Sequence, residues 1–236
     1  MATPASAHLS DARAVAAAGL PSLVEKPPAP DAGEARMLAA LEPTPWIGFN
    51  RRFEPAMADL HAAVGWREGL RLRLWFHYRR ASWAPVEVRD EAVLDLGPHA
   101  IDLVRWLAGP IRGVRAGTRS RERCELEVEL ERGIASISCA TDRVFRELVE
   151  VRAESGALVG RDSRGGPARA IVARLRPPTE HALVDSLAAE IESFCAAVRG
   201  SDPGVLATAE DGVAAMETVD AARRSADLDG AWVVVT

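Results

Sequence analysis

A lysine, a histidine and two aspartates in the first half of the chain have the types and spacing that acid–base chemistry needs. Asp95, His99 and Asp102 are four and three residues apart, so on one helix they share a face. A carboxylate beside an imidazole fixes its tautomer and stabilises the imidazolium, which is what a general base requires. The residues alone leave open a plainer alternative, an Asp–His pair that only joins two elements.

Lys26 is the only lysine of the chain, and the other 28 of its 29 basic residues are arginines. It directly follows Leu20 to Glu25, a segment typical of a short buried strand. In open α/β sheets, ligands bind outside the carboxyl ends of the strands. A lysine ammonium is also a compact charge whose pKa shifts more readily than that of a guanidinium. Lys26 is therefore a candidate contact for a cofactor ribose or a substrate hydroxyl, with a solvated loop lysine as the alternative.

The first 65 residues alternate between helix and strand, which predicts a parallel α/β layer. Such a sheet needs more than two strands. Because the alternation opens with a helix, we expect further strands to precede residue 1. The expected helices are 5–18, 31–42 and 53–64, and the expected strands are 20–25 and 46–49.

The remaining residues predict a second architecture. Apolar and polar side chains alternate in several segments, as in an antiparallel sheet with one face in water. We therefore expect an α/β fold, in which a parallel layer is followed by an α+β part with a large, mostly antiparallel sheet. The expected strands are 70–79, 124–130, 134–139, 148–153, 157–160, 168–175 and 232–235, most of them in an antiparallel meander, with helices at 95–107, around 183–198 and from Thr208 onward.

The composition argues against several classes of function. With a net charge of −5 and a pI of about 5.6, the chain has no overall basic field that would attract nucleic acid or an anionic membrane. The three cysteines are widely spaced and odd in number, which indicates no metal site and favours the cytoplasm. No apolar run approaches the roughly 20 residues that span a bilayer, and no signal peptide is recognisable at the start.

Four groups of residues occur together in a specific order, although each alone is a weak signal. They are Thr3-Pro4-x-x-x-His8, Glu25-Lys26-Pro27, the segment from Gly48 to Phe53, and Asp95-x-x-x-His99-x-x-Asp102 followed by Trp106-Leu107. In this combination the chain resembles the Gfo/Idh/MocA oxidoreductase family, which includes glucose-fructose oxidoreductase and inositol dehydrogenase. The resemblance extends over essentially the whole chain, including Asp211-Gly212 and the closing Gly230 to Val233.

The resemblance implies a truncated Rossmann-type domain at residues 1–50 and a substrate-binding and oligomerisation domain at residues 51–236. It also implies an NAD(P)-dependent oxidoreductase, with NAD or NADP as cofactor. Such an enzyme transfers a hydride between a nicotinamide and a sugar, cyclitol or related hydroxyl or carbonyl group. The expected partners are a small carbohydrate-like molecule and further copies of the chain as a homo-oligomer, with neither nucleic acid nor membrane.

By the same resemblance, His99 takes the proton of the alcohol, Lys26 polarises its oxygen, and Asp95 orients the imidazole. The residues implied for the cofactor are Thr3, Pro4, His8, Glu25, Lys26 and Pro27. Those expected to contact the substrate are Lys26, Arg51, Asp95 and His99, together with Trp83, which can stack on a sugar ring. Plain packing is the alternative for Trp83.

The sequence departs from the family at one point, because it contains no G-x-G-x-x-G turn to hold the cofactor pyrophosphate. Three explanations stay open: a misassigned start at Met1, a truly truncated gene, or a non-catalytic fragment that acts as a sheet-mediated binding or dimerisation module. We favour the first. The choice between NAD and NADP also stays open, since the residue that makes it follows the second strand of the absent region.

Overall fold

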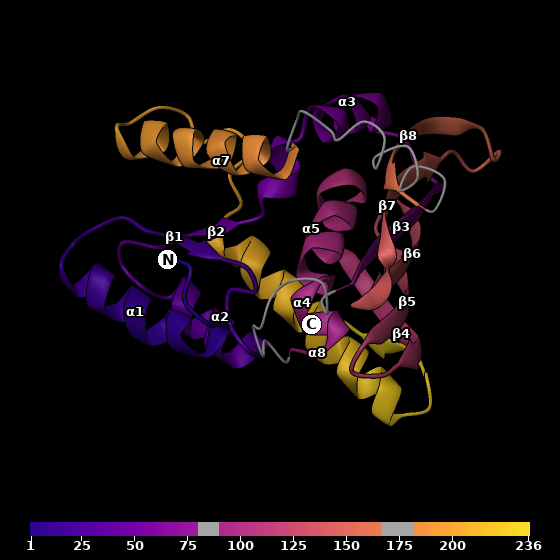
Figure 1. Cartoon of the computed structure of the whole chain (residues 1–236), viewed down its shortest axis with the longest axis horizontal. Coiled ribbons are helices and arrows are strands. Elements are labelled where there is room, and N and C mark those ends of the chain that lie inside the picture. Colours follow the sequence, from indigo (N-terminus) through magenta and orange to yellow (C-terminus); the bar gives the residue numbers. More distant parts are fainter. Residues whose placement is uncertain (80–89, 167–181) are drawn as a thin grey trace.

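The computed structural model of the chain describes residues 1–79, 90–166 and 182–236. Trp83 and the expected strand at 168–175 lie outside the described residues. The described elements form a small parallel sheet and a large mixed sheet, with helices between and around them (Figure 1).

The parallel layer at the start of the chain is confirmed. Its two strands pair in parallel with Val24 opposite Ile47, and both of these side chains are fully buried. Asp31 caps the second helix, because its carboxylate accepts a hydrogen bond from the Glu34 amide at 2.9 Å. The elements of this layer are α1 (Ala5–Ala17), β1 (Leu23–Glu25), α2 (Ala32–Ala39) and β2 (Trp46–Gly48).

Two helices lead from the parallel layer to the large sheet, and two more connect the strands β3 and β4 of that sheet. The helix expected at 95–107 is divided in two at Leu96. Asp95 therefore ends one helix and His99 lies in the first turn of the next, so the two residues do not share one continuous helical face. The elements are η1 (Asn50–Phe53), α3 (Pro55–Val64), α4 (Ala92–Asp95) and α5 (Gly97–Ala108).

The large sheet has seven strands in the order β8–β7–β3–β6–β5–β4–β9. The expected meander is wrong at one step, since β3 lies between β6 and β7, antiparallel to β7 and parallel to β6. Alternation indicates which face of a strand is buried, and it does not select the neighbouring strand. β4 is an additional strand whose two glycines and three arginines break any alternation. The strands are β3 (Leu70–Arg79), β4 (Ile111–Arg119), β5 (Arg123–Leu130), β6 (Gly133–Ala140), β7 (Asp142–Arg152), β8 (Leu158–Gly165) and β9 (Val233–Val234).

Helices cover one face of the large sheet, where α5 and α8 (Ala209–Asp227) lie against its strands (Figure 1). Leu126 and Val128 of β5 are buried beneath them, and the alternating Glu127 and Glu129 are exposed on the other face. In the described part of the chain that other face has no helix on it. Within the same residues, no helix is both long enough and apolar enough to cross a membrane.

The last helix of the chain packs against both sheets. α8 begins at the expected capping box, in which Thr208 and Asp211 exchange side-chain to backbone hydrogen bonds. It packs on α2 of the parallel layer and on β4 of the large sheet, and Ala207 just before it forms a bridge with Ile47 of β2. Residues late in the chain thus complete the first layer, and the division into domains at residues 1–50 and 51–236 stays a prediction.

Gly133 at the start of β6 has no room for a side chain, because a Cβ there lies 2.1 Å from the Leu70 carbonyl oxygen of β3. We predict that Gly133→Ala lowers the free energy of unfolding by about 2 kcal/mol, as overpacking does, measured by urea denaturation. Gly117→Ala on β4 is the control, since the nearest atom to its Cβ is 3.9 Å away. Equal losses in the two variants contradict the prediction.

Candidate functional site

Lys26 and Asp95 come together although 69 positions separate them in the sequence. The Lys26 ammonium donates a hydrogen bond to the Asp95 backbone carbonyl at 2.9 Å and lies 3.5 Å from the carboxylate oxygen Oδ1. The two side chains are only 18% and 11% exposed, so water screens their attraction weakly. This contact joins the carboxyl end of β1 to the end of α4.

The segment around Lys26 is held by its neighbours. The Lys26 backbone amide donates to Glu25 Oε2 at 3.2 Å, and the Glu25 side chain lies against Gly48, where a Cβ meets that oxygen at 3.3 Å. The Lys26–Pro27 peptide bond is cis. The buried His8 of α1 contacts the Pro27 carbonyl through Nδ1 at 3.0 Å. Because a carbonyl oxygen only accepts, Nδ1 carries the proton, and His8 anchors the turn that follows Lys26.

His99 lies at the same end of the parallel layer. Phe49 packs edge-on against its ring, with the ring centroids 6.3 Å apart. Phe49 directly follows β2 and Lys26 directly follows β1, and the carboxyl ends of these parallel neighbours lie side by side. The structure therefore brings Lys26, Asp95 and His99 to one edge, which is where open α/β sheets bind ligands.

Asp102 has a different role from the one that its spacing to His99 suggests. It is fully buried and binds the Arg52 guanidinium through both carboxylate oxygens, with Nε to Oδ2 at 2.9 Å. Arg52 also lies 3.0 Å from Asp211, so a single guanidinium joins η1, α5 and α8. Burial raises the pKa of Asp102 even with Arg52 beside it. Against the effect of burial, Arg52 holds the pKa of Asp211 below its usual value.

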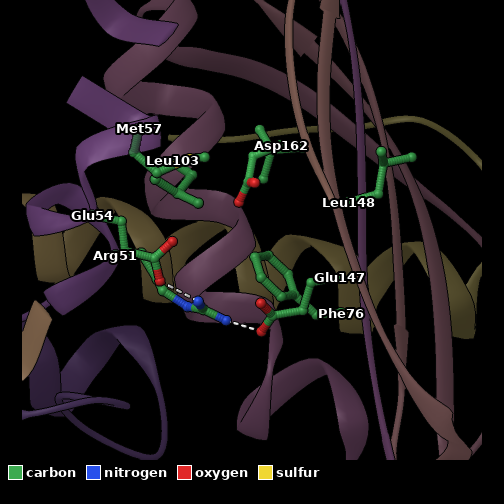
Figure 2. Close-up of a pocket in the computed structure, with 9 residues that line it drawn as sticks. Arg51, Glu54, Met57, Phe76, Leu103, Glu147, Leu148 and Asp162 are labelled. Atoms are coloured by element: carbon green, nitrogen blue, oxygen red, sulfur yellow. Dashed lines mark hydrogen bonds and ion pairs between the residues drawn. The ribbon is translucent and has the colours of Figure 1, made fainter. Parts of the chain in front are cut away.

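Arg51 lies in a separate buried network (Figure 2). Its guanidinium binds Glu54 and Glu147, and it donates to the Tyr78 hydroxyl at 3.0 Å. The cavity beside it, of about 10 Å³, has room for about one water molecule and none for a sugar. These bonds join η1 to the large sheet, and none of them brings Arg51 to Lys26.

The other residues implied for the cofactor lie at the start of the chain. Thr3 and Pro4 are exposed, and the Thr3 hydroxyl donates to Asp11 of α1 at 2.7 Å. The Met1 carbonyl accepts a hydrogen bond from the Glu25 amide at 2.9 Å, so this segment runs beside β1. Among the described residues, no group of three or more His, Cys, Asp or Glu side chains is placed to hold a metal ion.

The sequence did not predict the roles of two charged residues near this edge, Arg52 and Glu190. Arg52 directly follows Arg51, and nothing in the sequence separates the partners of two adjacent arginines. Glu190 of α7 (Ala182–Val198) is fully buried, although acidic residues are usually exposed. Its spacing from Leu187, three residues earlier, and from Phe194, four residues later, is the signal that could have placed it on an inner helix face.

Several known proteins resemble the chain, and three of them are informative. The rhizopine catabolism protein MocA of Rhizobium meliloti is 30% identical, over 98% of this chain and 77% of MocA. An inositol 2-dehydrogenase of Leifsonia xyli is 34% identical, over 57% of this chain and 44% of the enzyme. The solved structure of GenD2 from gentamicin A biosynthesis, in complex with NAD, is 25% identical with a TM-score of 0.78, over 100% of this chain and 77% of GenD2. No family model matches the chain.

The parallel layer, the large mixed sheet and these relatives together define an oxidoreductase. The chain belongs to the Gfo/Idh/MocA family, and it spans 77% of the length of MocA. The resemblance carried by the Glu25-Lys26-Pro27 and Asp95-x-x-x-His99 motifs is thereby confirmed at the level of the family.

The Arg52–Asp102 pair allows a test of how α5 is held. Asp102→Asn leaves Asp211 as the remaining carboxylate beside the buried Arg52 charge. We therefore predict that the free energy of unfolding falls by about 3 kcal/mol, as it does for other buried ion pairs that lose one partner. Urea denaturation measures it. The control is Glu217→Gln, which breaks a pair whose Arg36 side chain is 55% exposed; such pairs contribute about 1 kcal/mol at most. A loss no larger than the control's argues against this account.

Proposed function

We propose that the chain acts as an NAD(P)-dependent oxidoreductase on a hydroxyl or carbonyl group of a sugar, cyclitol or related molecule. The observation that supports this best is the contact of Lys26 with Asp95 at the carboxyl end of β1, beside the first turn of α5, which holds His99. An ammonium, a carboxylate and an imidazole at one edge supply a group that polarises the alcohol oxygen and a base that takes its proton.

Each of these residues has its own part in the proposed reaction. His99 takes the hydroxyl proton during oxidation and returns it during reduction. The Lys26 ammonium stabilises the negative charge that develops on the oxygen. Asp95 binds that ammonium through its backbone carbonyl and its carboxylate, which fixes where the positive charge lies. When bound, a nicotinamide supplies or accepts the hydride.

The residues present fit the nicotinamide end of such a cofactor. The carboxyl ends of parallel strands are where dinucleotides bind, and Lys26, Glu25 and Pro27 lie there, with the segment of Thr3 and Pro4 beside β1. The complex of GenD2 with NAD supports NAD or NADP as the cofactor of this chain. No G-x-G-x-x-G turn occurs in the sequence, so we assign no residue to the pyrophosphate.

The relatives support the proposed class of substrate. One of them is named an inositol 2-dehydrogenase and another a rhizopine catabolism protein, which favours a small polyhydroxylated molecule. They do not support the alternative of a non-catalytic binding or dimerisation module. The cytoplasm, expected from the cysteine count, stays a prediction.

Activity assays with variants of the two key residues test the function. We predict that His99→Gln and Lys26→Met each lower kcat by about 10²- to 10⁴-fold, which is the range for losing an acid–base group. Oxidation is assayed on myo-inositol and other cyclitols. The binding of NADH and NADPH is followed by fluorescence. His61→Gln is the control, because His61 is exposed and stacks on Trp106 with ring centroids 4.2 Å apart. Full activity of His99→Gln, or no binding of either cofactor by the wild type, overturns the proposal.

We also propose that copies of the chain associate through the helix-free face of the large sheet. Acidic side chains line β5 on this face and basic side chains line β3, with β6 between the two strands. A two-fold axis sets each stripe of one copy against the opposite charge of the next. The side chains are Glu125, Glu127 and Glu129 of β5, and Arg71 and Arg73 of β3.

Charge reversal on this face tests the assembly. We predict that Arg73→Glu lowers the molar mass in light scattering toward that of one chain, 25.3 kDa, because like charges then face each other across the axis. Arg199→Glu, an exposed residue after α7, is the control and keeps the wild-type mass. An unchanged mass for Arg73→Glu counts against this surface.

A further inference from the structure

Glu190 is a fully buried carboxyl group that the proposed reaction does not use. Neither of its carboxyl oxygens has a hydrogen-bond partner within the part of the chain that the structure describes. Burying a carboxylate without a donor is very costly, so a carboxyl group in such a place keeps its proton at a pH where exposed carboxyls are charged.

The direction in which Glu190 points is fixed by residues one turn away on α7. Ser186, four residues earlier, accepts a hydrogen bond from the Asn50 side-chain amide at 3.2 Å. Phe194, four residues later, packs edge-on against Trp46 of β2, with the ring centroids 5.7 Å apart. Residues four apart share a helix face. Glu190 therefore faces β2 and η1, beside the edge that holds the proposed site.

Charged groups on three different elements act electrostatically on Glu190: Glu25 at the end of β1, Arg52 on η1 and Asp102 on α5. Arg52 is already bound by two aspartates, whereas Glu25 accepts the hydrogen bond of the Lys26 amide. Burial and then the charges of Glu25 and Asp102 raise the pKa of Glu190 to about 8, and Arg52 acts against them. A second negative charge close to Glu25 is costly. Of the two carboxyl groups, Glu25 is the one that has a hydrogen-bond donor.

We propose that Glu190 is a positioning residue that acts on Lys26 through Glu25 by holding a proton at neutral pH. With Glu190 uncharged, the Glu25 side chain keeps its hydrogen bond to the Lys26 amide, and the Lys26 ammonium stays on Asp95. Loss of the proton places a second negative charge behind Glu25. The Glu25 carboxylate is then repelled from its place, and its hydrogen bond to the Lys26 amide weakens. The inference rests on the proposed function, since it gives Lys26 a part in binding cofactor and substrate.

A pH profile of activity separates this role from a merely structural one. Glu190→Gln keeps a neutral side chain of similar shape at every pH, and Glu192→Gln is the control, because Glu192 is exposed on the same helix. In the wild type and the control we expect kcat/KM to fall above about pH 8, mainly through a higher KM. In Glu190→Gln this fall is absent or lies at least about one pH unit higher. A fall at the wild-type pH in Glu190→Gln overturns the proposal.

A second measurement needs no activity. Infrared difference spectra between about pH 7 and about pH 9 are expected to show the loss of a protonated carboxylic acid band in the wild type and in Glu192→Gln, and not in Glu190→Gln. The pKa of Glu190 is higher in the folded than in the unfolded chain, so folding takes up a proton. The Tm therefore falls as the pH rises from about 5 to about 8, and it falls less in Glu190→Gln.

The two measurements distinguish the possible failures. A wild type without the titrating acid band overturns the proton on Glu190, even where Glu190→Gln does not fold. If the carboxylic acid band titrates but the wild type shows no activity with either NAD or NADP, the proposed function is overturned. The role of Glu190 toward Lys26 is then overturned with it.

Discussion

The Arg52 guanidinium holds together the segments on which the candidate site depends. It is 6% exposed, binds Asp102 of α5 through both carboxylate oxygens and lies beside Asp211 of α8. α5 begins with the turn that holds His99, and α8 packs on both sheets. The guanidinium therefore helps to hold the helix of His99 against the end of β2, which lies beside the end of β1 that Lys26 follows. A buried charge that loses a partner costs more than the intact pair contributes, so this ion pair acts as a constraint on geometry more than as a source of stability.

Two adjacent arginines belong to two separate polar networks in the interior. Arg51 and Arg52 lie on η1, a 3₁₀ helix in which successive side chains point about 120° apart. Arg51 therefore reaches Glu147 of the large sheet, while Arg52 reaches α5 and α8. A short helix with two identical residues thus ties the end of the parallel layer to two different parts of the molecule. Neither arginine is then available as a loose cation at the edge where Lys26 lies.

Local signals predicted the elements, and long-range packing decided what the sequence alone did not settle. Asp31 and the capping box at Thr208 mark helix starts through bonds to their own next turn, so the sequence contains the whole interaction. The break at Leu96 and the insertion of β3 between β6 and β7 depend on contacts between distant segments. For the same reason, the spacing in the sequence predicted His99 as the partner of Asp102, whereas in the folded chain Asp102 binds Arg52.

The contrast between Lys26 and the buried arginines explains why a chain so rich in arginine retains one lysine. Arg52 matches both oxygens of a carboxylate with its planar fork, which is the geometry that a guanidinium satisfies best. Lys26 instead meets one backbone carbonyl and one carboxylate oxygen of the same residue, Asp95. A compact ammonium fits that arrangement, whereas the planar guanidinium fork is shaped to meet two carboxylate oxygens at once. The cations that hold the fold are thus planar guanidinium groups, and the cation at the proposed reacting edge is a compact ammonium.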